Sequence, residues 1–122
     1  MFNVIDNYKV SNLRIGKCEF NMTDEVEFCA FLTTRYLNSK LMGPAHDWVA
    51  QNMPEMPRGV IRMRSFHMAP DRGMTIIWFN SQKNLDAAFP GLKEFQKVLA
   101  SRFEARCDAQ KGITSKEFDF GD

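Results

Sequence analysis

Few side chains in this sequence are of the types that usually do chemistry. The chain has only two histidines, His46 and His67. His67 alternates with Met63 and Ser65, so the three side chains would point to the same side of a strand. His67 is the candidate acid, base or ligand, although a single histidine with no carboxylate at a telling spacing is more often structural. His46 lies beside Asp47 and is expected to be solvated.

Aromatic and basic residues gather around His67. Trp78 ends an apolar run, and its ring could form the wall of a pocket or pack in the core. Arginines near it could hold a carboxylate or phosphate, although such clusters are more often paired at the surface. They are Arg58, Arg62, Arg64 and Arg72. The candidate ligand-binding residues are therefore Phe66, Trp78, Arg64 and Met63, with His67 as the candidate catalytic residue.

The three cysteines do not suggest a metal site. Cys18, Cys29 and Cys107 are widely spaced and form no Cys-x-x-Cys pair or His/Cys cluster. We expect reduced, packed thiols, because that is the usual state of intracellular cysteine. The sequence predicts neither a metal nor another cofactor.

Composition excludes several classes of protein. The chain has 122 residues and a formal net charge of +1, so no overall field attracts nucleic acid or anionic lipid. The longest apolar run, 74–79, is too short to span a bilayer, and Asp6 and Asn7 interrupt any signal peptide. We expect a cytoplasmic protein with one domain over residues 1–122 and no membrane or nucleic-acid partner.

The first half of the chain predicts one strand and two helices. Residues 15–22 alternate between apolar and polar, which indicates a half-buried strand. A capping-box pair, Asp24 and Glu27, predicts a helix that runs to about Ser39. A second, short helix is expected from Pro44 to before Pro54. Residues 1–14 are expected to form an N-terminal arm or an extra strand.

The second half predicts a hairpin, a divided helix and a last strand. Residues 60–68 and 74–79 are strand-like and are joined by a turn with proline, aspartate and glycine. Ser81 is the expected N-cap of a helix that Pro90 divides, and Gly112 is the expected C-cap before a strand over 113–120. The order β-α-β-β-α-β predicts an α+β, ferredoxin-like fold, with a four-stranded antiparallel sheet and both helices on one face.

Both faces of the expected hairpin carry large apolar side chains. The first strand offers Phe66 and Met68 on one face and Ile61 and Met63 on the other. Helices can cover only one of the two faces. A second sheet is therefore expected to close over the other face.

Two short motifs carry a resemblance to a known family. A strand that ends in tryptophan (Ile76-Ile-Trp78-x-x-Ser81) and a helix with Ala88-Phe-Pro90 resemble the dimeric α+β barrel superfamily. This superfamily includes antibiotic-biosynthesis-monooxygenase-like and stress-responsive barrel proteins. The resemblance implies a homodimer whose sheets face one another, with a cavity beside each sheet's open face. Its haem-degrading branch has a histidine on the second helix, and residues 82–110 contain none, so haem degradation is not expected.

Two functional classes stay open. The protein is expected to hold a small apolar or aromatic molecule, as a cofactor-free monooxygenase-like enzyme or as a non-catalytic ligand-binding or assembly module. RNA binding is a third class, suggested by Arg72-Gly73 followed by Ile77 and Phe79, which is similar to part of an RNA-recognition motif. This class is weaker than the other two. The positions that should stack on bases are Met74 and Ile76, which are not aromatic.

Overall fold

The computed structural model describes residues 26–121 of the chain. They form two units, one of residues 29–112 and one that includes 26–28 and 113–121. In the smaller unit, Thr114 N–H donates to the Glu27 carbonyl at 3.0 Å, and Glu27 N–H donates to Thr114 Oγ1 at 2.9 Å. The expected arm over 1–14 and the strand over 15–22 lie outside the described residues. The single domain over 1–122 stays a prediction.

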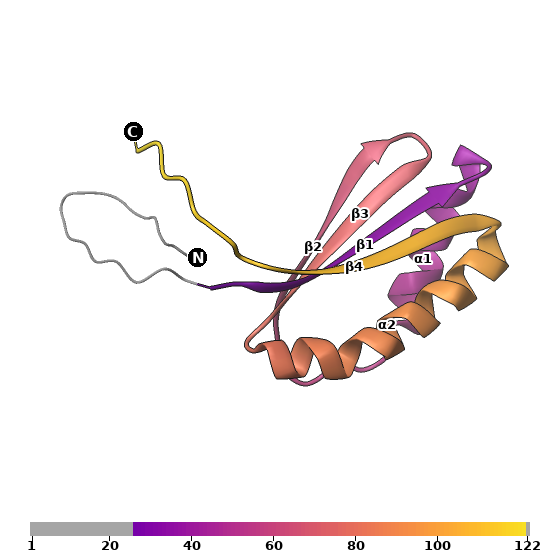
Figure 1. Cartoon of the computed structure of the whole chain (residues 1–122). Helices are drawn as coiled ribbons and strands as arrows, with labels where there is room; N and C mark the ends of the chain where they lie inside the picture. Colours follow the sequence, from indigo (N-terminus) through magenta and orange to yellow (C-terminus); the bar gives the residue numbers. More distant parts are fainter. Residues whose placement is uncertain (1–25, 122) are drawn as a thin grey trace, which may run out of the picture. The chain divides into compact units, whose positions relative to one another are not determined.

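The strands form one antiparallel sheet in the order β2-β3-β1-β4 (Figure 1). Their bounds are β1 Phe28–Tyr36, β2 Val60–Ala69, β3 Arg72–Phe79 and β4 Ala105–Ile113. With helices α1 and α2 they follow the order β-α-β-β-α-β, which is the split βαβ arrangement. The predicted ferredoxin-like fold is confirmed.

The first strand was predicted as a helix, and that prediction was wrong. Apolar residues such as Phe28, Leu32 and Tyr36 fit helical spacing, yet residues 28–36 form β1. Aromatic and β-branched side chains favour the pleated backbone, and every second residue from Ala30 to Tyr36 faces the helices. The expected short helix is instead the first crossover helix, α1 Met42–Asn52, preceded by a 3-10 turn at Ser39–Leu41.

The hairpin was predicted correctly. In the β2–β3 pairing, Ser65 lies opposite Thr75, and Met63 lies opposite Ile77. The register shifts between Val60 and Arg62 and again between His67 and Ala69. Regular alternation between these shifts gives the two strands distinct faces.

The second helix, α2 Gln82–Phe103, begins at its predicted cap and continues through Pro90. Ser81 Oγ accepts a hydrogen bond from Asn84 N–H at 3.1 Å, as expected of an N-cap. The predicted division at Pro90 was wrong. Pro90 is exposed, so the carbonyl that loses its intrahelical partner lies on the solvent side, where water can hydrate it.

The last strand lies earlier than predicted. Helix α2 ends where Glu104 adopts a left-handed conformation with φ 52°, a position where glycine or asparagine is the usual signal. Residues 105–113 then form β4, and residues 114–120 form no strand. Cys107 continues the spacing of the helical apolar stripe through Leu99 and Phe103, which explains the wrong prediction of helix here. Ala105 and Cys107 also alternate with Arg106 and Asp108, as expected of a strand.

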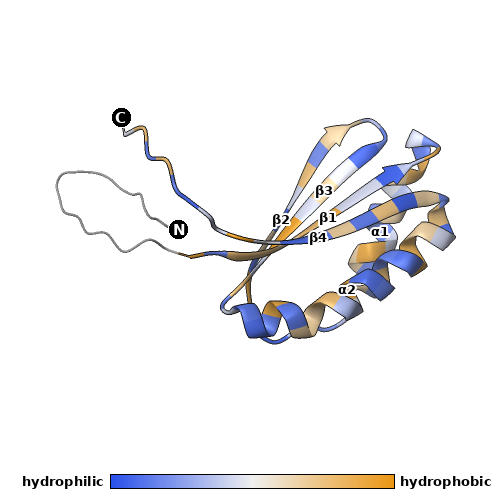
Figure 2. Cartoon of the chain, viewed as in Figure 1, coloured by the Kyte–Doolittle hydropathy of each residue, from blue (hydrophilic) through white to orange (hydrophobic). Residues whose placement is uncertain are grey.

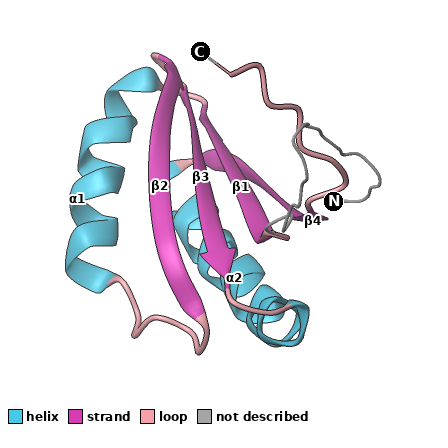
Figure 3. Cartoon of the chain, turned by 90° about the vertical axis from the view of Figure 1, so that its left-hand side faces the viewer, coloured by secondary structure: helices cyan, strands magenta, loops and turns pink. Residues whose placement is uncertain are grey.

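Both helices cover the same face of the sheet (Figure 3). Tyr36, Met42, Ala45 and Leu99 form one buried cluster. The Trp48 ring of α1 stacks on Phe95 of α2 at 5.6 Å between ring centroids. Hydrophobic and hydrophilic residues alternate along α2, as expected of a helix with one buried side (Figure 2).

Candidate functional site

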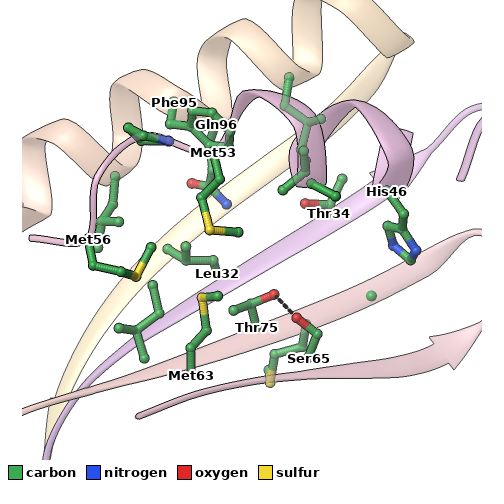
Figure 4. A pocket seen from close by; sticks show the side chains of 18 of the residues that line it. Leu32, Thr34, His46, Met53, Met56, Met63, Ser65, Thr75, Phe95 and Gln96 are labelled. Atoms are coloured by element: carbon green, nitrogen blue, oxygen red, sulfur yellow. Dashed lines mark hydrogen bonds between the residues drawn. The ribbon is translucent and has the colours of Figure 1, made fainter. Parts of the chain in front are cut away.

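A cavity of about 700 Å³ lies between the sheet and the two helices (Figure 4). Strands β1, β2 and β3 form its floor, and α1, α2 and the segment between α1 and β2 form its other walls. Successive side chains of each strand alternate between this side of the sheet and the opposite side. We call the opposite side the open face. The resemblance implied a cavity beside the open face, whereas the cavity seen here lies on the helix side.

Most of the cavity wall is apolar and adaptable. Met53 and Met56 extend over the cavity from the α1 side, and Met63 rises from β2 below them (Figure 4). Leu92 and Phe95 contribute from α2. Methionine side chains are flexible and polarisable, so they can adjust to ligands of irregular shape.

Polar side chains gather toward one part of the cavity. Ser65 and Thr75 are joined by a hydrogen bond of 2.8 Å between their hydroxyl oxygens. His67 comes next on β2 on the same side and lies opposite Gly73. His46 reaches toward the same part from α1 and is exposed, as expected (Figure 4). Both histidines are exposed residues, so they border the cavity where it meets solvent.

Gly73 leaves the floor open at this polar end. Tyr36 N–H donates to the Asp71 carbonyl at 2.7 Å, which brings Thr34, two residues earlier on the antiparallel strand, close to Gly73. His67 lies on the other side of Gly73. A glycine between these two side chains leaves room for a ligand atom to approach the backbone.

One polar residue of the cavity is buried. Gln96, on α2, is only 6% exposed, and it lines the cavity. Its Nε2 donates to the Thr33 carbonyl at 3.3 Å and to the Asp108 carbonyl at 3.0 Å. The amide therefore bridges β1 and β4 and holds α2 over the middle of the sheet.

Two titratable side chains lie beside the polar end, namely Tyr36, which is buried, and Cys107, which is half-buried. Burial raises the pKa of the Tyr36 hydroxyl, and the nearby Cys107 adds to this rise. Burial also raises the pKa of the Cys107 thiol, and a contact with Thr34 Oγ1 at 3.7 Å opposes the rise. A raised pKa means little thiolate at neutral pH, so Cys107 is suited to packing and not to nucleophilic attack.

The structure divides the predicted site residues between the two faces of the sheet. His67 and Met63 line the cavity, and Phe66 borders it. Arg64 and Trp78 do not line this cavity. Arg64 lies opposite Ile76, and Trp78 lies opposite Arg62, on the open face. The five predicted residues therefore do not form one site.

The open face has a chemistry of its own. The Arg62 guanidinium lies 4.0 Å from the centre of the Trp78 ring, and the Arg64 guanidinium lies 5.7 Å from the Phe66 ring. Both are cation–π contacts. Trp78 Nε1 is buried and has no hydrogen-bond partner within the described part of the chain. An indole N–H usually finds a partner when buried.

Sequence reasoning missed Thr34 and Tyr36 because it assigned the first strand as a helix. It also missed Gln96, although Gln96 lies on the predicted helix α2. Gln96 nevertheless carried a signal. It lies between Leu92 and Leu99 on the apolar stripe of α2, and a buried polar residue on such a stripe must find partners. Met53 and Met56 follow the end of α1. The sequence alone does not show whether residues after a helix end line a cavity or lie in a loop at the surface.

Among residues 26–121, no group of three or more histidine, cysteine, aspartate or glutamate side chains is arranged to hold a metal ion. Neither of the helices described for this chain is long and apolar enough to cross a membrane.

Known structures support the fold. Two crystal structures of dimeric ferredoxin-like proteins from uncultured marine organisms match with TM-scores of 0.61. The first is 18% identical and covers 77% of this chain and 100% of its own; the second is 13% identical and covers 80% and 96%. A protein of unknown function from Nitrosomonas europaea is 11% identical over 78% of this chain and 97% of its own, with a TM-score of 0.54. No family model matches the sequence, and no curated protein matches it significantly.

Proposed function

We propose that the protein is a homodimer that binds a small, mainly apolar or aromatic molecule in the cavity between sheet and helices. The observation that carries the proposal is the cavity itself, with its methionine and phenylalanine walls and its polar groups gathered toward one part. A volume of about 700 Å³ falls within the range of pockets for small organic ligands. A cytoplasmic location, expected from the sequence, belongs to the same proposal.

The open face supports the homodimer. Phe66 is 43% exposed and Met68 is 52% exposed, and both lie on the edge strand β2. A second sheet placed on this face would remove apolar surface from water. The marine structural neighbours are themselves described as dimeric.

A thermal-shift screen tests ligand binding. Binding to the folded state alone raises the free energy of unfolding by RT ln(1 + [L]/Kd), so the melting temperature rises with ligand concentration. Substituted naphthalenes and medium-chain fatty acids are suitable probes, because they match the size and apolar character of the walls. We expect the aromatic probes to raise the melting temperature.

Two neighbouring alanines give a matched control for this screen. Ala88 lines the cavity, and Ala87, the preceding residue of α2, is exposed and does not line it. Ala88→Phe should fill part of the cavity and abolish the ligand-induced shift, whereas Ala87→Phe should leave the shift unchanged. Equal shifts in both variants, or no shift with any probe in the unaltered protein, would refute binding in this cavity.

Catalysis is the second candidate function. The observation in its favour is that His67, the predicted catalytic residue, lines the same cavity as His46. An imidazole could take the proton of a phenol or enol, and such an anion can react with dioxygen without a cofactor. We would measure dioxygen consumption with dihydroxynaphthalenes. Consumption that is lost in His67→Gln but retained in His46→Gln assigns the base to His67; no consumption above the uncatalysed rate leaves the non-catalytic binding module.

A further inference from the structure

We propose that Gln96 Oε1 is a fixed hydrogen-bond acceptor for the ligand, so that the cavity selects molecules bearing a hydrogen-bond donor, such as a hydroxyl group on an aromatic ring. The inference rests on the proposed binding function and specifies its ligand class. It adds a specificity-determining residue that the sequence analysis did not identify.

The orientation of the Gln96 amide follows from its neighbours. Both groups that it contacts are backbone carbonyls, of Thr33 and Asp108, and a carbonyl can only accept. The nitrogen must therefore face them, because the reverse orientation would set three acceptor oxygens against one another. The two hydrogens of Nε2 are both used, and the oxygen is left pointing away from these carbonyls.

The remaining oxygen has no protein donor. No hydrogen bond to Gln96 Oε1 occurs within residues 26–121, although the residue is 94% buried, being 6% exposed. Gln96 lines the cavity and hangs from α2 toward the sheet, between Phe95 and Leu32 (Figure 4). Gln96 Oε1 is not among the buried side-chain atoms that lack a partner, so water in the cavity can reach it. A ligand that displaces this water leaves the oxygen unpaired unless the ligand brings a hydrogen-bond donor, and an unpaired oxygen costs free energy.

The walls around Gln96 make its oxygen selective. Its neighbours in the cavity are apolar, namely Leu32, Leu92, Phe95 and Leu99. A ligand that places an ether or methyl group against the oxygen leaves it unpaired, whereas a hydroxyl or N–H satisfies it. Sites built to hydrogen-bond one group discriminate against analogues that lack it.

Three ligands of similar shape test this selectivity: 1-naphthol, 1-methoxynaphthalene and 1-methylnaphthalene. They offer a donor, an acceptor alone, and neither. From the usual net value of a neutral hydrogen bond, we expect 1-naphthol to bind about fivefold to tenfold more tightly than the other two by titration calorimetry. Equal affinities of all three would overturn the inference while leaving the binding function in place.

Variants then assign the preference to Gln96. Gln96→Met keeps the length of the side chain and removes the acceptor, so it should bind the three ligands with similar affinity. Thr75→Val, which removes a hydroxyl on the cavity floor, should retain the preference for 1-naphthol. A preference that survives in Gln96→Met and disappears in Thr75→Val would move the acceptor to the Ser65–Thr75 pair and refute the role of Gln96.

A measurement on the unaltered protein covers the case in which Gln96→Met does not fold. A donor bound to Oε1 polarises the amide, so the Nε2 proton signals of Gln96 should shift on addition of 1-naphthol and shift less with 1-methoxynaphthalene. Equal shifts would count against the inference. If none of the three ligands binds, the proposed function itself fails, and the inference fails with it.

Discussion

The two faces of one sheet satisfy their side chains in different ways. On the helix side, Ile77 and Phe79 are almost fully buried by the chain itself, and the hydroxyls of Ser65 and Thr75 bond to each other. On the open face, Trp78 contacts an arginine, and its indole N–H has no partner among the described residues. On the helix side, the cavity is the space that the two helices leave unfilled. The open face requires something more, which we infer to be a second copy.

The largest expected effect lies on the helix side. Phe79 is 1% exposed and is among the largest fully buried side chains of residues 26–121. Phe79→Ala should lower the free energy of unfolding by about 3–5 kcal/mol, because it removes buried surface and leaves a cavity. Phe120→Ala is the matched control, since Phe120 is 93% exposed. Urea denaturation measures both, and a loss below about 1 kcal/mol for Phe79→Ala would mean that this face is not the core.

The next effect tests the open face. Ile76 lies on β3 opposite Arg64, among side chains that the proposed second copy would cover. Ile76→Lys should add a desolvated charge beside existing arginines and weaken dimerisation about a hundredfold or more. Sedimentation velocity at micromolar concentration should then show monomers. Val98→Lys, at an exposed position of α2, should remain dimeric. A wild-type protein that is monomeric under these conditions would contradict the proposed homodimer.

The fold was predictable from the sequence even though two elements were assigned wrongly. The hairpin, the Ser81 cap and the second helix follow from local signals that the structure retains. The predicted strand-helix order was right, but it was reached with strands placed at 15–22 and 113–120. The first and last strands described by the structure are instead residues 28–36 and 105–113. The sequence analysis assigned both segments to helices because their apolar spacing fits a helix and a strand equally well.

The candidate site was less predictable than the fold. His67 and Met63 share the cavity because alternation on β2 is a local property, which sequence shows. The relation of Gln96 to the carbonyls of Thr33 and Asp108 depends on three elements distant in sequence. The choice of face for the cavity likewise depends on how far the helices stand from the sheet, and no residue pattern encodes that distance.

A smaller effect concerns pH. Burial raises the pKa of the Tyr36 hydroxyl above its ordinary value, so the folded state holds this proton more tightly than the unfolded state. The resulting stabilisation is fully present below the unfolded pKa of about 10 and is lost as the pH rises through the folded pKa. Tyr36→Phe should therefore lose less stability than the wild type when urea denaturation is moved from pH 9 to pH 11. A Tyr36→Phe profile parallel to the wild type would contradict this linkage.

The smallest effect separates a bare open face from a covered one. An exposed cation–π contact contributes about 0.5–1 kcal/mol, and a desolvated one contributes about 2 kcal/mol. The coupling between Arg62 and Trp78, measured by a double-mutant cycle with Arg62→Gln and Trp78→Leu, should therefore be small at protein concentrations where monomers predominate. It should grow at concentrations where dimers form, because the second copy excludes water from the pair.

The Arg64–Phe66 contact gives a comparison for this cycle. The guanidinium of Arg62 lies 4.0 Å from the centre of the Trp78 ring, whereas the guanidinium of Arg64 lies 5.7 Å from the centre of the Phe66 ring, so the same cycle on Arg64 and Phe66 should give a weaker coupling. A coupling at Trp78 that does not change with protein concentration would mean that the partner sheet does not reach this residue, and the proposed interface would have to lie elsewhere on the open face.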